Sequence, residues 1–297
     1  MKAIVFGGSG FVGSHVADAL TAAGHETTVF DLRESAWLGD GQRMVIGDMG
    51  DLDAVRAAVR GQDAVFNFAG IADIDDSRRR PIDTVQVNVL GNVNLLEACR
   101  QEGTGRYVFA SSIYVQSEAG SFYRVSKQAC ELYIEEYHRE FDLEYTILRY
   151  GTLFGRRASD RNSVHRYLRS ALVDRKVVAE GTGEELREYI HVEDAARLTA
   201  EILADEYANE QVVLTGHFPM RYADLLRLVQ EIVGADVEVE LQPPGGDEPD
   251  SAHYAITPYA FRPRVARKLV SSYYIDMGQG LLDVLAEIHE GEDGAAS

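Results

Sequence analysis

A tyrosine and a lysine stand four positions apart, at Tyr123 and Lys127. Side chains at this spacing lie on one face of a helix. A phenol with an unperturbed pKa near ~10 can act as a base at neutral pH only if its phenolate is stabilised, for example by an ammonium group. Ser111 and Ser112 end an apolar run just before the pair, where a hydroxyl can bond the reacting oxygen. The pattern predicts that Tyr123 acts as a base.

A glycine-rich run stands between a predicted strand (2–6) and a predicted helix (13–23). Glycine there permits a tight turn and close approach of the backbone to a pyrophosphate, which the N–H groups at the helix start attract. A Walker A loop is poorly supported because its lysine is absent. The run therefore predicts a dinucleotide site. It consists of Gly7, Gly8, Ser9, Gly10, Phe11, Val12 and Gly13.

The last residue of the second predicted strand indicates whether the cofactor is NAD or NADP. Asp31 follows Gly13 by eighteen residues. A carboxylate there accepts hydrogen bonds from both hydroxyls of an adenosine ribose and repels a 2′-phosphate, so NAD is expected. Arg33 is the competing signal for NADP.

The elements that position these residues alternate between β-branched runs and amphipathic helices, which indicates a parallel sheet covered on both faces. We expect an α/β protein with a doubly wound parallel (Rossmann) sheet and a smaller C-terminal α/β substrate domain. The NAD-binding domain would cover 1–155 plus about 189–215, and the substrate domain about 156–188 and 216–297. The expected strands are 2–6, 26–31, 44–47, 64–69, 107–111, 145–149 and 212–214, and the expected helices 13–23, 51–60, 81–102, 122–141, 222–233 and 279–289.

Composition excludes several classes of partner. With 29 basic and 48 acidic residues the formal charge is -19, which disfavours nucleic acid and anionic membranes. No apolar run approaches the ~18 residues of a membrane span, and no signal peptide is recognised, so a cytoplasmic protein is expected. Cys99 and Cys130 are expected to be buried reduced thiols, and no metal site is predicted. The acidic, lysine-poor composition suits either a high-salt habitat or a GC-rich genome.

Over nearly its whole length the sequence resembles the extended short-chain dehydrogenase/reductase family, the NAD-dependent epimerases and dehydratases of nucleotide sugars. Its last two motifs point to the extended, sugar-nucleotide branch. Besides the glycine run and the Tyr123/Lys127 pair, the motifs that carry the resemblance are Asp48, Phe68-Ala69-Gly70, Asn88-Val89-Leu90-Gly91-Asn92, Ser111-Ser112-Ile113-Tyr114-Val115, residues 148–155 and residues 187–194.

The resemblance implies a role for each matching residue. Tyr123 would be the base, Lys127 would bind the nicotinamide ribose, and Ser112 rather than Ser111 would be the third catalytic residue. Arg187 would contact the nucleotide diphosphate. The expected substrate contacts are Ser112, Tyr123, Thr152, Arg187, His253 and Arg262. The expected cofactor contacts are Gly7, Ser9, Gly10, Phe11, Val12, Gly13, Asp31, Leu32, Arg33, Asp48, Met49, Phe68, Ala69, Gly70, Asn88, Ala110, Ser111, Tyr123, Lys127, Tyr150 and Thr152.

Other residues are expected to serve the structure. Tyr189 and His191 should pack within their strand, and Asp194 should stabilise the start of the next helix. By resemblance to the family, a homodimer would form through the helices 81–102 and 122–141.

The sequence departs from the family pattern around the substrate. Gln116 stands where a tyrosine is usual, and Tyr123 follows Ser112 by only eleven positions, so the loop that covers the sugar in relatives is nearly missing. Thr152 replaces an asparagine that touches the substrate in many epimerases. The loop 243–254 lacks the arginine that relatives offer to the phosphates, for which His253, Arg262 or Arg264 can substitute.

The reaction follows from the residues after Ser112. In 4,6-dehydratases an Asp-Glu pair stands there, but this chain has Ile113 and Tyr114, so dehydration is disfavoured. The remaining reaction is 4-epimerisation of a nucleotide-diphosphate sugar through a transient keto sugar, with net dehydrogenation or keto reduction as the alternative. A non-catalytic NAD-binding sensor or scaffold is the alternative of another class, and the intact Tyr123/Lys127 pair argues against it.

Overall fold

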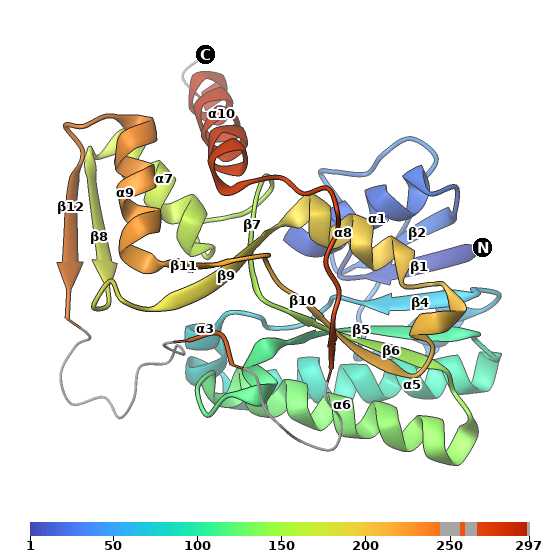
Figure 1. Ribbon diagram of the computed structural model, residues 1–297. Coiled ribbons are helices and arrows are strands. Elements are labelled where there is room, and N and C mark those ends of the chain that lie inside the picture. Colours follow the sequence, from blue (N-terminus) through green and yellow to red (C-terminus); the bar gives the residue numbers. More distant parts are fainter. Residues whose placement is uncertain (244–255, 259–265, 296–297) are drawn as a thin grey trace. The chain divides into compact units, whose positions relative to one another are not determined.

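The fold is seen in a computed structural model that describes residues 1–243, 256–258 and 266–295 (Figure 1). The chain forms two compact units, each described separately below. The predicted domains were defined by what they bind, NAD or substrate, so their boundaries stay a prediction. The first unit comprises Met1–Tyr150, Ala196–Leu214 and Pro258–Leu269, and the second comprises Gly151–Ala195, Thr215–Thr257 and Val270–Ser297.

The first unit is built on an eight-stranded sheet in which every pairing is parallel. Residues such as Val65, Phe66 and Phe109 are fully buried, as expected for a sheet covered on both faces. Because all strands run the same way, their carboxyl ends form one edge, where ligands bind in such sheets. Across the sheet the order is β13 (Arg267–Lys268), β10 (Glu210–Leu214), β6 (Tyr145–Tyr150), β5 (Arg106–Ser112), β4 (Ala64–Asn67), β1 (Lys2–Phe6), β2 (Glu26–Asp31) and β3 (Arg43–Ile46).

The hydrophobic core on one face of this sheet is formed with helices α2, α5 and α6, which contribute Val55, Leu95, Leu96 and Ile134. Helix α1 buries Val16 and lies across the sheet from α5 and α6 (Figure 1). The expected α/β fold with a doubly wound parallel sheet is confirmed. The helices are α1 (Phe11–Ala22), α2 (Leu52–Val59), α3 (Ile74–Arg79), α4 (Pro81–Thr84), α5 (Gly91–Glu102), α6 (Ser121–Phe141) and α8 (Val192–Glu201, shared with the second unit), with short helices at Ile113–Gln116 and Asp205–Tyr207.

The helix expected over 81–102 is not uniform. Residues Val85–Leu90 are π-helical, between α4 and α5. A π-helical turn holds more residues than an α-helical one and is found mostly at functional sites. Here it contains Asn88, whose carbonyl accepts a hydrogen bond from Cys130 Sγ at 3.2 Å. Hydrophobic spacing could not reveal this interruption, because the six residues Val85–Leu90 are too few to distinguish the period of a π-helix from that of an α-helix.

The second unit has two small sheets around its own core. That core includes Phe154, Tyr167, Leu226 and Leu281. The last helix is longer than the expected 279–289 and continues through Ala295. The strands are β7 (Thr152–Phe154), β9 (Leu186–His191) and β11 (Pro219–Arg221) in one sheet and β8 (Lys176–Glu180) and β12 (Glu238–Gln242) in the other, and the helices are α7 (Ser163–Val173), α9 (Tyr222–Val233) and α10 (Met277–Ala295).

Several predicted properties can be compared with the described residues. Cys99 and Cys130 are buried free thiols, as expected. No helix in the described ranges is long and apolar enough to cross a membrane. The same ranges bring together no group of three or more His, Cys, Asp and Glu side chains that could hold a metal ion.

Candidate active site

The glycine run forms a tight turn between β1 and α1. Gly7 has a φ of +76°, and a Cβ atom built on it would lie 2.5 Å from the Ala69 nitrogen. A Cβ on Gly13 would lie 2.2 Å from the Gly7 carbonyl oxygen, so only glycine lets the helix pack this close. Gly10 precedes α1 and provides no side-chain cap. The first N–H groups of α1 have no acceptor within the helix, which is the arrangement that binds a pyrophosphate.

Asp31 is held beside this turn. The backbone N–H of Ser9 donates to Asp31 Oδ2 at 3.1 Å, and the Ser9 hydroxyl donates to the Arg33 carbonyl at 3.0 Å. The structure thus brings together the phosphate turn and the carboxylate that the sequence assigned to the ribose. Leu32 and Arg33 are both exposed. The donors and the acceptor fit the two ends of the adenosine diphosphate half of NAD.

The segment after β4 is locked by an amide side chain. Asn88 Oδ1 accepts from the Ile71 N–H at 2.7 Å, and Asn88 Nδ2 donates to the Ile71 carbonyl at 3.0 Å and to Ser126 Oγ at 2.9 Å. This fixes Phe68, Ala69 and Gly70 next to the glycine turn. Since protein partners occupy both amide atoms of Asn88, we expect it to act by positioning this segment, and its contact with the cofactor stays a prediction.

The two serines at the end of β5 have different partners. Ser111 Oγ donates to Glu131 Oε1 at 2.6 Å, whereas Ser112 Oγ accepts from the Tyr114 N–H at 3.3 Å. Neighbouring residues on a strand point to opposite faces. The Ser111 proton is therefore engaged inside the protein, and the Ser112 hydroxyl keeps its proton for another acceptor. This supports Ser112 as the catalytic serine.

Tyr123 and Lys127 lie near the start of α6. Lys127 Nζ lies 5.8 Å from the centre of the Tyr123 ring and donates to the Ala110 carbonyl at 2.7 Å. Burial lowers the pKa of Lys127, while the neighbouring Cys130 and Glu131 act to raise it. The Tyr123 ring meets the Tyr114 ring edge-to-face, with centroids 6.3 Å apart. The predicted one-face placement of the two side chains is confirmed.

The other predicted cofactor contacts of the first unit differ in how exposed they are. Asp48 is exposed and accepts from the Gly50 N–H at 2.8 Å, whereas Met49 belongs to the buried core. Tyr150 is buried, its hydroxyl lies 2.5 Å from Thr199 Oγ1, and burial raises its pKa. The Phe68 ring lies 6.0 Å from the Tyr150 ring. A cofactor could reach Met49 and Tyr150 only through small exposed parts of each residue.

The predicted substrate residues of the second unit lie on paired strands. Thr152 is on β7 and Arg187 on β9, and the register pairs Thr152 with Tyr189. Both side chains are half-buried. His253 and Arg262 lie outside the described residues, as does Arg264.

The packing residues of β9 are as predicted. His191 is 1% exposed, its ring meets Phe154 edge-to-face at 5.2 Å, and burial lowers its pKa. Tyr189 packs against the same core. Asp194 is in the first turn of α8, as expected, and also accepts from the Ile275 N–H at 2.6 Å. That second contact could not be seen from local sequence.

Three residues at the site were missed by sequence reasoning. Ser77 is fully buried, and its hydroxyl accepts from the Tyr123 N–H at 3.2 Å. It thereby bonds an N–H of the first turn of α6, whose N-cap residue Gly120 has no side chain to do so. Glu131 and Arg149 form a buried ion pair one turn beyond Lys127. Glu131 follows Lys127 by four residues, a helical spacing that could have indicated it, but Ser77 and Arg149 carry no local signal.

Comparison with known proteins identifies the family of this chain. The model of the NAD dependent epimerase/dehydratase family matches residues 3–215. The chain belongs to this family. It is therefore an NAD-dependent enzyme of the extended short-chain dehydrogenase/reductase type, as the sequence motifs predicted. The glycine turn, Asp31 and the Tyr123/Lys127 pair all lie in the first unit, and their contacts with NAD stay predictions.

Individual family members differ in their reactions. The dTDP-glucose 4,6-dehydratase of Streptomyces niveus is 26% identical over an alignment, gaps included, that covers 90% of this chain and 89% of that protein. The UDP-N-acetyl-α-D-glucosaminuronate decarboxylase of Bacillus cytotoxicus is 26% identical over 241 residues, covering 72% of this chain and 74% of that one. The structure of UDP-glucose 4-epimerase from Thermus thermophilus, in complex with NAD, superimposes with a TM-score of 0.81 at 25% identity, covering 97% and 99% of the two chains.

Proposed function

We propose that this enzyme is an epimerase that inverts C4 of a nucleotide-diphosphate sugar through a transient keto sugar. The observation that carries the proposal is the set formed by Ser112, Tyr123 and Lys127, with Ile113 and Tyr114 where a dehydratase has its carboxylates. Ile113 is 1% exposed and Tyr114 packs against Tyr123. Neither residue can exchange a proton with carbon as a carboxylate does.

The chain's own residues account for the proton steps. The Ser112 hydroxyl donates a hydrogen bond to the sugar oxygen, and Tyr123 Oη takes the hydroxyl proton as C4 is oxidised and gives it back on reduction. The Lys127 ammonium favours the phenolate of Tyr123 through its charge. Bound NAD supplies the hydride acceptor and donor at C4.

Residues of the second unit would hold the rest of the substrate. Arg187 has the forked guanidinium that suits a diphosphate, and Thr152 lies on the neighbouring strand. Because the loop that covers the sugar in relatives is nearly missing and Thr152 replaces an asparagine, the proposal names neither the sugar nor the nucleotide base. Retention of the keto sugar would depend on closure of the site.

The proposal is tested with a panel of UDP-, GDP-, CDP- and dTDP-sugars. Purified enzyme supplied with NAD is expected to form the C4 epimer of one of them without accumulation of NADH, measured by product chromatography and by absorbance. Net NADH formation would favour the dehydrogenase alternative. Loss of water or of carbon dioxide from the sugar would contradict the epimerase proposal, since relatives include dehydratases and a decarboxylase.

We also propose a homodimer through the helical layer of α4, α5 and α6. Val85, Leu90 and Leu132 are more than half exposed there. In the same layer Leu96 is buried in the core, whereas Val85 faces outward. Light scattering is expected to show twice the chain mass at micromolar concentration, and a particle of 32.8 kDa would contradict the dimer.

A further inference from the structure

A buried ion pair lies behind the catalytic residues, and the chemistry proposed above does not use it. Glu131 is on α6, and Arg149 is near the end of β6. Arg149 Nε donates to Glu131 Oε1 at 3.0 Å, and Arg149 Nη2 donates to Glu131 Oε2 at 2.7 Å. Each side chain is 9% exposed. Removing two charges from water is costly and only a good geometry offsets it, so a buried pair is weak evidence for stability alone.

The carboxylate of Glu131 is fixed in one orientation. Its Oε1 also accepts the Ser111 hydroxyl at 2.6 Å. Ser111 and Arg149 are register partners on the neighbouring strands β5 and β6, so both donors come from the rigid sheet. Rotation of the carboxylate would break at least one of these three hydrogen bonds.

Arg149 is held as firmly as its partner. Its Nη2 also donates to Gln211 Oε1 at 2.7 Å, from β10. With the Gln116 amide assigned from its partners, Gln116 Oε1 accepts from Arg149 Nη1 at 3.0 Å and Nε2 donates to the Pro258 carbonyl at 3.1 Å. The residue that departs from the family's tyrosine thus belongs to this network. The guanidinium is positioned from three sides and forms an ion pair with Glu131.

A nearby negative charge would favour the ammonium form of the buried Lys127 side chain. It is buried, donates to the Ala110 carbonyl and lies against the rings of Phe109 and Tyr123. Burial lowers its pKa, and the two groups that oppose this are Cys130 and Glu131. Burial raises the pKa of the Cys130 thiol to about 12, so that thiol is neutral near pH 7. Glu131 is therefore the charged group that favours the ammonium form.

We propose that Glu131, which is buried one helical turn beyond Lys127 on α6 and is oriented by Arg149 and Ser111, is a positioning residue that favours the ammonium form of Lys127 beside Tyr123. The proposal rests on the proposed function only through the role of Lys127. Without the pair, Tyr123 would lose the cation that stabilises its phenolate, although no residue that touches the substrate had changed.

The small number of lysines makes a direct test possible. The chain has only Lys2, Lys127, Lys176 and Lys268, so protein labelled with ¹³C at lysine Cε gives four signals, and Lys127→Arg identifies the one of interest. The test variant combines Glu131→Gln with Arg149→Met, because removing both charges leaves no unpaired buried ion. In it, the Lys127 titration midpoint is expected to fall by at least about one pH unit, a tenfold change in the ratio of ammonium to amine at a given pH.

The matched control uses the ion pair at the other end of the same strands. Arg106→Met combined with Glu144→Gln is expected to leave the Lys127 midpoint at the wild-type value. An unchanged midpoint in the folded Glu131/Arg149 variant would overturn the proposal. If that variant does not fold, Glu131→Asp replaces it. This change withdraws the carboxylate by one methylene and is expected to lower the midpoint by a smaller amount, and no change would again overturn the proposal.

Failure of the proposed function is distinguishable from failure of this inference. The lysine titration needs no substrate, so an enzyme that turns over none of the nucleotide sugars would still show the shift. Conversely, 4-epimerisation with an unshifted Lys127 midpoint would leave the function standing and refute the role of Glu131.

Discussion

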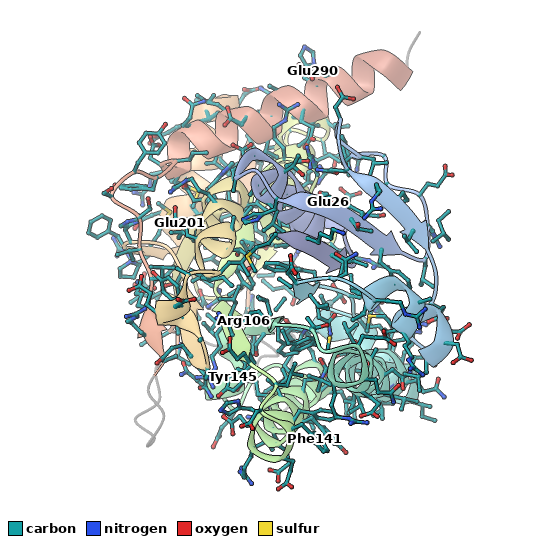
Figure 2. All side chains as sticks on the ribbon, turned by 90° about the vertical axis from the view of Figure 1, so that its right-hand side faces the viewer. Glu26, Arg106, Phe141, Tyr145, Glu201 and Glu290 are labelled. Carbon is teal, nitrogen blue, oxygen red and sulfur yellow. The ribbon has the colours of Figure 1, made fainter. Side chains whose placement is uncertain are left out.

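Two arginine–glutamate pairs connect β5, β6 and their surroundings, one at each end of these strands. At the amino ends, Arg106 Nη2 lies 3.2 Å from Glu144 Oε2, and the Glu144 side chain is 51% exposed. Figure 2 shows this end of the sheet, where Arg106 and Tyr145 begin the two strands. At the carboxyl ends, Arg149 and Glu131 are both buried. Arg149 is the register partner of Ser111, and Glu131 lies one helical turn beyond Lys127.

The difference shows what a buried charge does in this fold. At the amino ends the carboxylate of Glu144 stays partly in water although Arg106 is buried, so only one charge of that pair is desolvated. At the carboxyl ends the charges are desolvated, and the network around them reaches the residues assigned to chemistry. Substitutions at matched positions of the two ends can therefore separate function from stability.

The largest contrast is expected between two tyrosines. Tyr123→Phe removes the proton acceptor and is expected to lower kcat by about 10²–10⁴-fold while NAD still binds. Tyr145→Phe, at the amino end of β6, is expected to leave kcat at the wild-type level. Steady-state kinetics and NAD titration measure both. Activity of Tyr123→Phe within tenfold of wild type would remove its assignment as the base.

The two arginines should differ in stability. Arg149→Met leaves Glu131 as an unpaired buried charge, which is expected to reduce the free energy of unfolding by about 3–5 kcal/mol. Arg106→Met leaves Glu144 in solvent and should cost about 1 kcal/mol. Urea denaturation of both variants compares these losses. Equal losses would contradict the distinction between the two ends.

The ends of β2 allow the same comparison for the cofactor. Asp31→Ala is expected to bring the affinities for NAD and NADP closer by at least tenfold, which corresponds to ~1.4 kcal/mol, since Arg33 can then meet the added phosphate. Glu26→Ala, at the amino end of β2, should leave the preference unchanged. Fluorescence titrations with both cofactors decide this. An unmoved preference in Asp31→Ala would mean that Asp31 does not contact the ribose.

Salt is expected to have the smallest effect. The formal charge of -19 creates repulsion that ions screen over about 10 Å at 0.1 M and about 3 Å at 1 M. If the acidic surface suits a high-salt habitat, the melting temperature should rise between these concentrations. A melting temperature that does not rise, combined with inhibition over the same range, would favour the GC-rich genome as the origin of the composition.

Much of the fold was predictable because its signals are local. The glycine run, Asp31 and the spacing of Tyr123 and Lys127 each act within one turn or one strand end. The structure places Asp31 beside the glycine turn and Lys127 beside Tyr123. The π-helical turn at Asn88 was not predictable, because it depends on contacts with Ile71 and Ser126 that only the folded chain makes.

The supporting residues of the site show the same limit. Ser77 meets Tyr123 across 46 positions of sequence, and Arg149 meets Glu131 across 18. No sequence pattern around Ser77 or Arg149 indicates these contacts, because the partner of each residue lies on another element of the fold. The roles of Thr152 and Arg187 on the second unit stay predictions.

The central claim is that C4 of the sugar is oxidised and then reduced within one site. The most direct measurement uses the nucleotide sugar identified from the panel, carrying deuterium at C4, in ordinary water. The account predicts that the epimer formed keeps the deuterium at C4, as seen by mass spectrometry and NMR, because the same hydride is returned to the opposite face. Epimer in which C4 carries hydrogen from water would contradict it.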